Sequence, residues 1–144
     1  MNLSENFTLK ELTDSNTAVK LGIDNTPPGD VVPKLQALAV NVLQPLRNWY
    51  GKPICISSGY RCPRLNVAVG GSKTSQHLRG EAADIDIKGD LTAGRKMFEY
   101  IKNNLVFDQL IWEHDKGGCY WVHVSYKSTG RNRHDVIGNL LKKG

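Results

Sequence analysis

The chain has 144 residues, 40% hydrophobic and 23% charged, a composition typical of one globular domain and not of a disordered chain. No apolar run approaches the roughly 20 residues that cross a bilayer, so we expect no membrane insertion. The formal net charge of +5 would suit a polyanionic partner, but the 19 lysines and arginines are scattered, and charge alone does not predict nucleic-acid binding.

The first third of the chain is predicted to be helical. Residues 8–11 fit a capping box that opens a short helix, and residues 25–29 form a turn. Across residues 30–49, apolar side chains recur at steps of three and four, which predicts an amphipathic helix ended by Gly51. Pro45 predicts a kink or an irregular last turn in this helix.

Strand patterns dominate the middle of the chain. The short apolar run at residues 53–57 predicts a buried strand. Residues 82–87 alternate with a period of two and predict a strand with Asp84 and Asp86 on one face. Residues 92–105 have helical spacing and predict a second long helix.

The last predicted elements form a hairpin. Strands at residues 107–113 and 119–126 are joined through a glycine-containing turn at residues 115–118. We predict a polar tail from about residue 128. Helices first and a hairpin last indicate an α+β fold with a mostly antiparallel sheet, in a single domain over residues 1–144.

Cysteine content and the N-terminal residues bear on the compartment. Three cysteines cannot all pair, so we expect ordinary reduced thiols at Cys55, Cys62 and Cys119. Residues 1–6 have neither a basic nor an apolar region, so no secretory signal is expected.

A possible metal site begins in the loop before the second strand. His77 lies in that loop, and Asp84 follows seven residues later on the polar face of the strand. Gly80 allows a tight turn between them. A catalytic zinc needs about three nitrogen or oxygen ligands and one open position, and these two residues could supply two ligands.

His123 is the best candidate for a third ligand. It lies in the second strand of the hairpin, on the face opposite Val122 and Val124. His114, beside the turn, and His134, in the tail, are weaker candidates. Spacing alone leaves open that these histidines and aspartates are unrelated surface groups.

Three blocks of sequence, spread over about residues 6–126, resemble the zinc D-Ala-D-Ala carboxypeptidase family, peptidase M15. Its wider group includes phage L-alanyl-D-glutamate endolysins, D-Ala-D-Ala dipeptidases and the hedgehog signalling domain. The matching residues are Ser75, His77, Gly80, Ala82 and Asp84 in the first block, residues 58–61 with Asn66 and residues 69–71 in the second, and residues 121–124 in the third. The resemblance implies a hedgehog/DD-peptidase-like fold with helices flanking the sheet.

The resemblance also implies the metal ligands and a substrate clamp. His77, Asp84 and His123 would bind one Zn²⁺ per chain, with Asp86 as the rival to Asp84 because it shares the same face. Arg61 would bind the scissile carbonyl or a substrate carboxylate through its planar guanidinium, unless it forms only a surface salt bridge.

Two further substrate-binding residues are weaker expectations. Ser75 would hydrogen-bond the substrate backbone, or else only shape its loop. Asn66 would contact the substrate, or else only end a short helix.

The general base is where this chain departs from its relatives. Several relatives have an acidic residue three positions before the last histidine, and Tyr120 occupies that position here. A phenol is a poor base, and by strand parity Tyr120 points away from His123. We therefore expect Glu113, at the end of the preceding strand, to be the general base, with Asp115 in the turn as the alternative.

The resulting functional prediction is a zinc-dependent peptidase that hydrolyses D-amino-acid-containing amide bonds of peptidoglycan stem peptides. It would be a D,D-carboxypeptidase or an endolysin-type endopeptidase. The alternative is a non-catalytic, hedgehog-like zinc domain that binds a partner protein. We expect a monomer that binds no nucleic acid, is made in the cytoplasm, and acts at the cell wall or periplasm after lysis if a phage or prophage encodes it.

Overall fold

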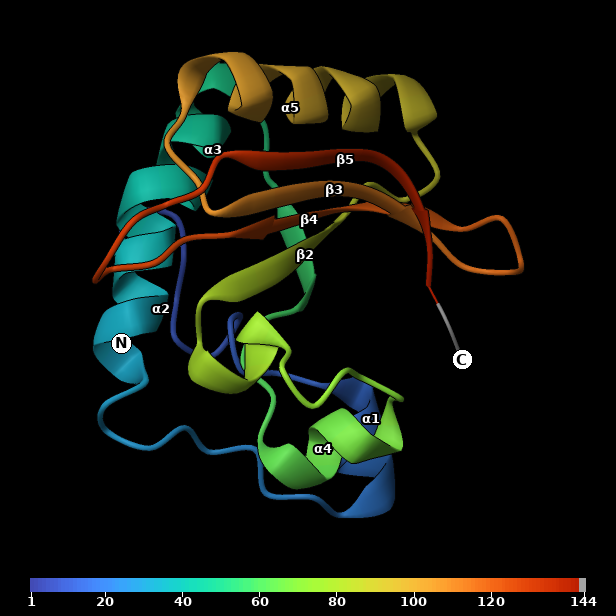
Figure 1. Cartoon of the computed structure of the whole chain (residues 1–144). Helices are drawn as coiled ribbons and strands as arrows, with labels where there is room; N and C mark the ends of the chain where they lie inside the picture. Colours follow the sequence, from blue (N-terminus) through green and yellow to red (C-terminus); the bar gives the residue numbers. More distant parts are fainter. Residues whose placement is uncertain (143–144) are drawn as a thin grey trace.

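A computed structural model describes residues 1–142 and contains both helices and strands (Figure 1). The helices are α1 (Asn16–Leu21), α2 (Val32–Leu38), the π-helical turn η1 (Ala39–Leu43), α3 (Gln44–Tyr50), α4 (Pro63–Ala68), the 3-10 turn η2 (Gln76–Arg79) and α5 (Leu91–Asn104). The strands are β1 (Cys55–Ser58), β2 (Ala82–Asp86), β3 (Gln109–His114), β4 (Tyr120–Ser125) and β5 (Asp135–Leu141).

The five strands form one sheet in the order β1-β2-β4-β3-β5. The β1–β2, β2–β4 and β3–β4 pairs are antiparallel, and only β5 runs parallel to its neighbour β3. The predicted α+β fold with a mostly antiparallel sheet is therefore confirmed, and so is the hairpin of β3 and β4. The segment predicted as a polar tail from about residue 128 contains β5, which the sequence analysis did not predict and which forms one edge of the sheet.

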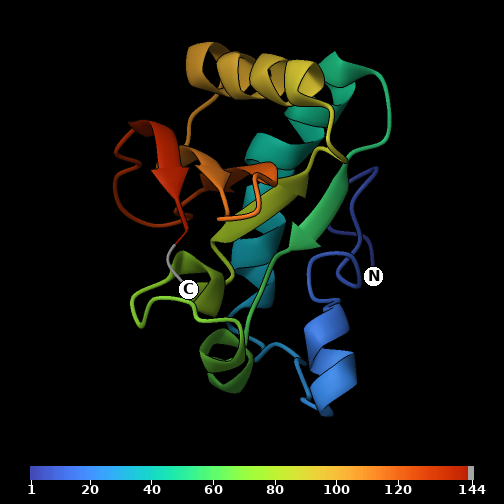
Figure 2. The ribbon, with the colours of Figure 1, turned by 90° about the vertical axis from the view of Figure 1, so that its right-hand side faces the viewer.

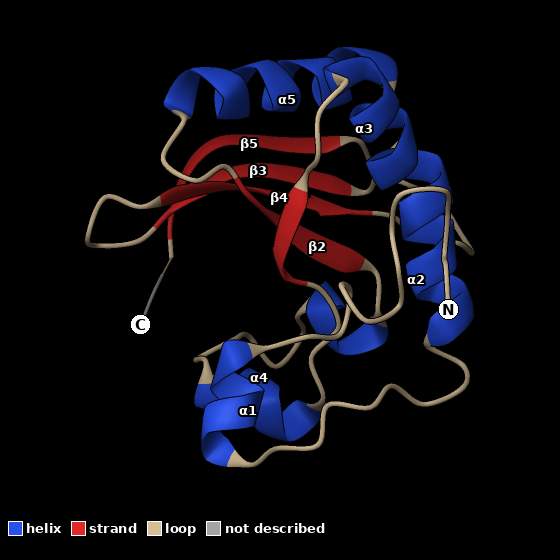
Figure 3. Ribbon diagram, turned by 180° about the vertical axis from the view of Figure 1, so that it is seen from behind, coloured by secondary structure: helices blue, strands red, loops and turns tan. Residues whose placement is uncertain are grey.

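The two faces of the sheet have different environments. Helix α5 packs on β3 and β4, and α1 and α4 lie together beyond the opposite face (Figures 1 and 3). Figure 2 shows the same separation from the side. Val122 and Val124 on β4 are fully buried in the core, so the alternate residues Trp121 and His123 face away from it. No helix within residues 1–142 is long and apolar enough to cross a membrane.

The long helix predicted before the sheet is one continuous helical segment with an internal irregularity. Leu35, Val42 and Leu46 are fully buried, which confirms the predicted apolar stripe up to Leu46, whereas Trp49 at its end is exposed. The π-helical turn η1 ends immediately before the turn that contains Pro45. Proline has no backbone N–H and its ring crowds the carbonyl four residues earlier, which accounts for widening at this point and not in the last turn.

The capping box at residues 8–11 forms without the helix that it predicts. The backbone N–H of Thr8 donates to the Glu11 carboxylate, and that of Glu11 donates to the Thr8 hydroxyl. Only turns follow: the N–H groups of Leu12 and Asp14 donate four residues back, and the carbonyl of Leu12 accepts from the N–H of Tyr60 at 2.7 Å. The first helix, α1, instead begins after Ser15, whose hydroxyl accepts from its first turn.

Strand β1 is confirmed, but the prediction that it is buried is wrong. It is the edge strand beside β2, and its side chains alternate between exposed and half-buried. Cys55 lies there and is exposed. All three cysteines are unpaired, as predicted.

Candidate metal centre

His77 is held in place by the turn in which it lies. Its backbone N–H donates to the hydroxyl of Ser75, which caps η2. Gly80 ends the turn in the left-handed conformation at φ +72°, where a β-carbon would also lie 2.6 Å from Val31. The His77 imidazole is only 2% exposed, and its Nδ1 lies 2.7 Å from the carbonyl oxygen of Gly59. A carbonyl can only accept, so Nδ1 carries the proton and Nε2 has its lone pair available.

Asp84 and His123 are brought together by strand register. They are directly opposite each other in the antiparallel pair of β2 and β4. Nδ1 of His123 lies 2.9 Å from Oδ1 of Asp84, and Nε2 of His77 lies 3.4 Å from the same oxygen. The rings of the two histidines are 5.2 Å apart, centroid to centroid.

These three side chains could hold a metal ion. Each offers one ligand atom, and the three atoms lie within 4.8 Å of one another. Nε2 of His77 is buried and has no hydrogen-bond partner among residues 1–142, although it is directed at this cluster. A buried imidazole with one nitrogen fixed by a carbonyl and the other unpartnered is the usual arrangement of a histidine metal ligand. The residues present therefore fit a zinc ion.

The ionisation states of the cluster agree with metal binding. Burial lowers the pKa of His77, against the attraction of Asp84, and so favours the neutral imidazole. Burial by itself would raise the pKa of Asp84, but the neighbouring His77 and the hydrogen bond from His123 hold it well below its ordinary value. Neutral imidazole and ionised carboxylate are the forms that bind metal.

Arg61 lies beside this cluster and is held there by contacts with residues 66–72. Its Nη2 is 4.0 Å from Oδ2 of Asp84, and its Nη1 donates to Oδ1 of Asn66 at 2.9 Å. The amide nitrogen of Asn66 donates to the carbonyl of Ser72. A β-carbon at Gly71 would lie 2.1 Å from the Asn66 oxygen and 2.5 Å from Nη1 of Arg61, so only glycine permits this packing.

Of the two weaker predicted substrate contacts, Ser75 reaches the cleft and Asn66 does not. Ser75 lines the cleft described below, although its hydroxyl also accepts from the N–H of His77. Asn66 is 3% exposed, lies behind Arg61, and uses both ends of its amide within the protein. Burial lowers the pKa of Arg61, against the attraction of Asp84.

Glu113 faces the same cleft from the neighbouring strand. It is opposite Trp121 in the β3–β4 register, and the indole Nε1 donates to its Oε1 at 3.0 Å. Burial raises the pKa of Glu113, and the negative charge of Asp84 adds to this effect. Tyr120 is on the opposite face and stacks on Trp112, as strand parity predicts.

The alternative acids point elsewhere. Asp86 is exposed and accepts from the backbone N–H of Lys88. Asp115 closes the hairpin turn by accepting from the N–H of Cys119. Neither aspartate lines the cleft.

The other two histidines are likewise accounted for. His114 stacks on Tyr120, and the ring of His134 packs at a tilt against Phe107. Neither is a member of the metal-binding cluster.

The cluster opens into a cleft with a volume of about 800 Å³. Its lining includes residues that the sequence analysis did not select, among them Lys127, Arg133 and Lys142 from the segment after β4. The side chains that line the cleft and carry charge are Arg61, Arg79, Asp84, Asp108, Glu113, Lys127, Arg133 and Lys142. Lys127 could have been found by extending the alternation of residues 121, 123 and 125 by one step. Trp121 could have been found as the cross-strand neighbour of Glu113.

Comparison with known proteins identifies the family. The model of the peptidase M15 family matches residues 5–125, which include the three clustered residues, Arg61 and Glu113. No significant match was found among curated proteins. The match covers most of the chain, and the zinc dependence of the family agrees with the His-Asp-His cluster in the cleft. The chain therefore belongs to the peptidase M15 family of zinc metallopeptidases.

Proposed function

We propose that the protein hydrolyses D-amino-acid-containing amide bonds of peptidoglycan stem peptides, as a D,D-carboxypeptidase or an endolysin-type endopeptidase. The observation that carries this proposal is the unpartnered Nε2 of His77 beside Asp84 and His123, in a cleft that also contains Glu113 and Arg61. A site that only stabilised the fold would be closed by a fourth protein ligand, whereas this one opens into a cleft.

His77, Asp84 and His123 would hold one zinc ion. When bound in such a site, zinc polarises the scissile carbonyl and lowers the pKa of water. The contact from the Gly59 carbonyl fixes the His77 ring, so the ligand is oriented before metal arrives.

Glu113 would act as the general base. The pKa of its carboxyl group is raised toward neutral pH. A base that accepts a proton and returns it to the leaving amine is most effective when its pKa lies near the working pH. Trp121 supports one oxygen of this carboxylate, which leaves the other oxygen for water. The catalytic water would lie between Glu113 and the ligand cluster.

Arg61 would bind the scissile carbonyl or a substrate carboxylate. Its Nη2 faces Asp84 at 4.0 Å, and Asn66 and Ser58 fix the other two nitrogens of the guanidinium. Such pre-orientation reduces the cost of arranging charge when the oxyanion develops. In this proposal Asn66 positions Arg61, and Ser75 shapes the loop and offers its oxygen at the cleft.

Digestion of purified peptidoglycan tests the proposal. The zinc-loaded protein should release stem-peptide fragments whose masses identify the cleaved amide bond. Treatment with a chelator should stop the release, and added zinc should restore it. A preparation with bound zinc that releases no fragment would contradict the proposal and favour a non-catalytic zinc domain that binds a partner.

A further inference from the structure

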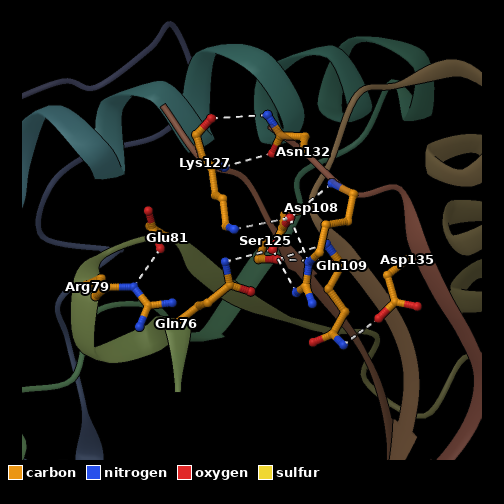
Figure 4. A network of polar contacts seen from close by, with 10 residues as sticks. Gln76, Arg79, Glu81, Asp108, Gln109, Ser125, Lys127, Asn132 and Asp135 are labelled. Carbon is orange, nitrogen blue, oxygen red and sulfur yellow. Dashed lines mark hydrogen bonds and ion pairs between the residues drawn. The ribbon is translucent and has the colours of Figure 1, made fainter. Parts of the chain in front are cut away.

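A second constellation of charged residues lies in the cleft, outside the metal centre. Asp108, immediately before β3, is fully buried and is surrounded by side chains from distant parts of the chain (Figure 4). The backbone N–H and the guanidinium of Arg133 donate to its carboxylate at 2.9–3.1 Å. Nε2 of Gln76 donates to Oδ2 at 3.1 Å, and Nζ of Lys127 lies 3.9 Å from Oδ1.

The two cations of this constellation, Arg133 and Lys127, share the carboxylate of Asp108. The carboxylate of Asp135, which accepts from Gln109, also acts on Arg133. In the described part of the chain, by contrast, Lys127 pairs with Asp108 alone. Nε and Nη2 of Arg133 donate to Asp108, and within residues 1–142 its Nη1 has no hydrogen-bond partner. Nζ of Lys127 makes only the long ion pair, and this side chain is one-third exposed. Donors therefore remain for an anion in the cleft.

Hydrogen bonds within the protein fix the position of this constellation. Gln76 is 9% exposed and is the immediate neighbour of His77, so it joins the metal loop to Asp108. The backbone of Lys127 is held from both sides by the Asn132 side chain, with contacts of 2.8 and 3.1 Å. Both cations thus have fixed starting points, which lowers the entropic cost of binding a ligand.

Its distance from the metal centre suits a peptide ligand. Lys127 lies two residues beyond the end of β4 and four residues after His123, and four residues of extended chain span at most about 13 Å. An extended peptide covers that distance in about four residues. A substrate bound at the metal could therefore present a second carboxylate to this end of the cleft.

We propose that Lys127 and Arg133, supported by Asp108 and Gln76, form a subsite for a carboxylate of the peptide substrate, away from the scissile bond. The inference rests on the proposed function for the nature of that substrate. Both cations lie beyond the residues that the family model matches, which end at residue 125. The subsite would therefore be a feature of this chain's own C-terminal segment, and would select among stem peptides.

Binding of non-cleavable stem peptides to the zinc-loaded full chain tests this inference. Isothermal titration would compare peptides with reduced backbone amides in two arms. In the first arm, two peptides differ only in having a carboxylate or a carboxamide on the D-glutamyl residue. In the second arm, two peptides differ in the same way at the C-terminus. We expect the wild type to bind the carboxylate form about tenfold more tightly in one arm, which identifies the carboxylate bound.

Lys127→Gln removes one cation of the subsite and should reduce that preference to about twofold. The fold should remain intact, because Lys127 is not needed to satisfy Asp108. The double variant Asp108→Asn/Arg133→Gln removes the buried anion together with its partner, and should have the same effect without an unpaired buried charge. Lys73→Gln, an exposed change of equal charge outside the cleft, should leave the preference unchanged.

The inference would be overturned if the wild type showed no preference in either arm, or if Lys127→Gln kept it. Hydrolysis of the matching cleavable peptides is measured separately. If the wild type hydrolyses none of them but shows a preference that depends on Lys127, the proposed function is refuted and the subsite is not. If it hydrolyses them but shows no preference, the subsite is refuted and the proposed function is not.

Discussion

Two buried aspartates line the cleft, and their surroundings differ. The Asp108 carboxylate accepts four hydrogen bonds, three from Arg133 and one from Gln76. The Asp84 carboxylate accepts one hydrogen bond within residues 1–142, from His123, and is also 3.4 Å from the unpartnered Nε2 of His77.

In both aspartates burial acts to raise the pKa, and neighbouring groups lower it below its ordinary value. The number of donors, and not the pKa, therefore separates an aspartate that anchors the fold from one that remains available to a metal. The expected effects of substitution follow from this difference.

The largest expected effect comes from replacing Asp84. Asp84→Asn keeps the volume of the side chain but removes the charge needed by a zinc ligand, so we expect turnover to fall by more than about a hundredfold. Asp108→Asn, the same change at the other aspartate, should lower turnover by less than about tenfold. Initial rates on peptidoglycan measure both, and equal losses would show that the two aspartates do not have separate roles.

Glu113→Gln should be the next most damaging change. It preserves size and can still accept from Trp121, but it removes basicity, and general-base help is typically worth 10²–10⁴-fold. We expect a loss of at least about a hundredfold, with zinc content and melting temperature nearly unchanged. Asp115→Asn, in the turn beside it, should matter little. The reverse order would place the base in the hairpin turn.

Arg61→Lys should have an intermediate effect. Lysine keeps the positive charge near Asp84 but cannot reproduce the planar fork held by Ser58 and Asn66. We expect roughly a tenfold or greater loss of kcat/KM, with zinc still bound. A lysine variant with wild-type rates would show that Arg61 does not clamp the substrate.

The smallest expected effect is on stability. Asp108→Asn should lower the free energy of unfolding by about 2 kcal/mol at pH 7, because charge-assisted hydrogen bonds are lost. The pKa of Asp108 is lowered in the folded protein, so its contribution is complete above the unfolded pKa of about 3.9 and is lost as pH falls through the folded pKa.

Urea unfolding at pH 7 and pH 3 checks this dependence. The difference between wild type and Asp108→Asn should be larger at pH 7. Asp86→Asn, at an exposed aspartate, serves as the control and should change stability little. An Asp108→Asn difference that grew toward pH 3 would contradict the assignment.

The parts of the site that could be predicted depend on local pattern. Period-two alternation placed His123 opposite the valines of β4 and Tyr120 away from the cleft, and the structure agrees. The motif placed His77 and Asp84 near one another, and strand register brings His123 to them.

The rest depended on contacts between distant residues. Strand β5 contains a glycine and an asparagine, and only its parallel pairing with β3 makes it a strand. The side chains around Asp108 come from 32 positions before it and 25 after it, a separation over which no local pattern operates. The capping box at Thr8 formed locally as predicted, but only turns follow it, and the Leu12 carbonyl pairs with the distant N–H of Tyr60.

The central claim, that His77, Asp84 and His123 form a zinc site, is tested most directly by elemental analysis of protein purified without added metal. We expect about one zinc per chain in the wild type, and a strongly reduced content in His77→Ala and His123→Ala, since each loses one of three ligands. His114→Ala is the matched control and should keep its zinc, because His114 stacks on Tyr120 outside the cluster. Wild-type zinc content in both His77→Ala and His123→Ala would contradict the assignment of the metal centre.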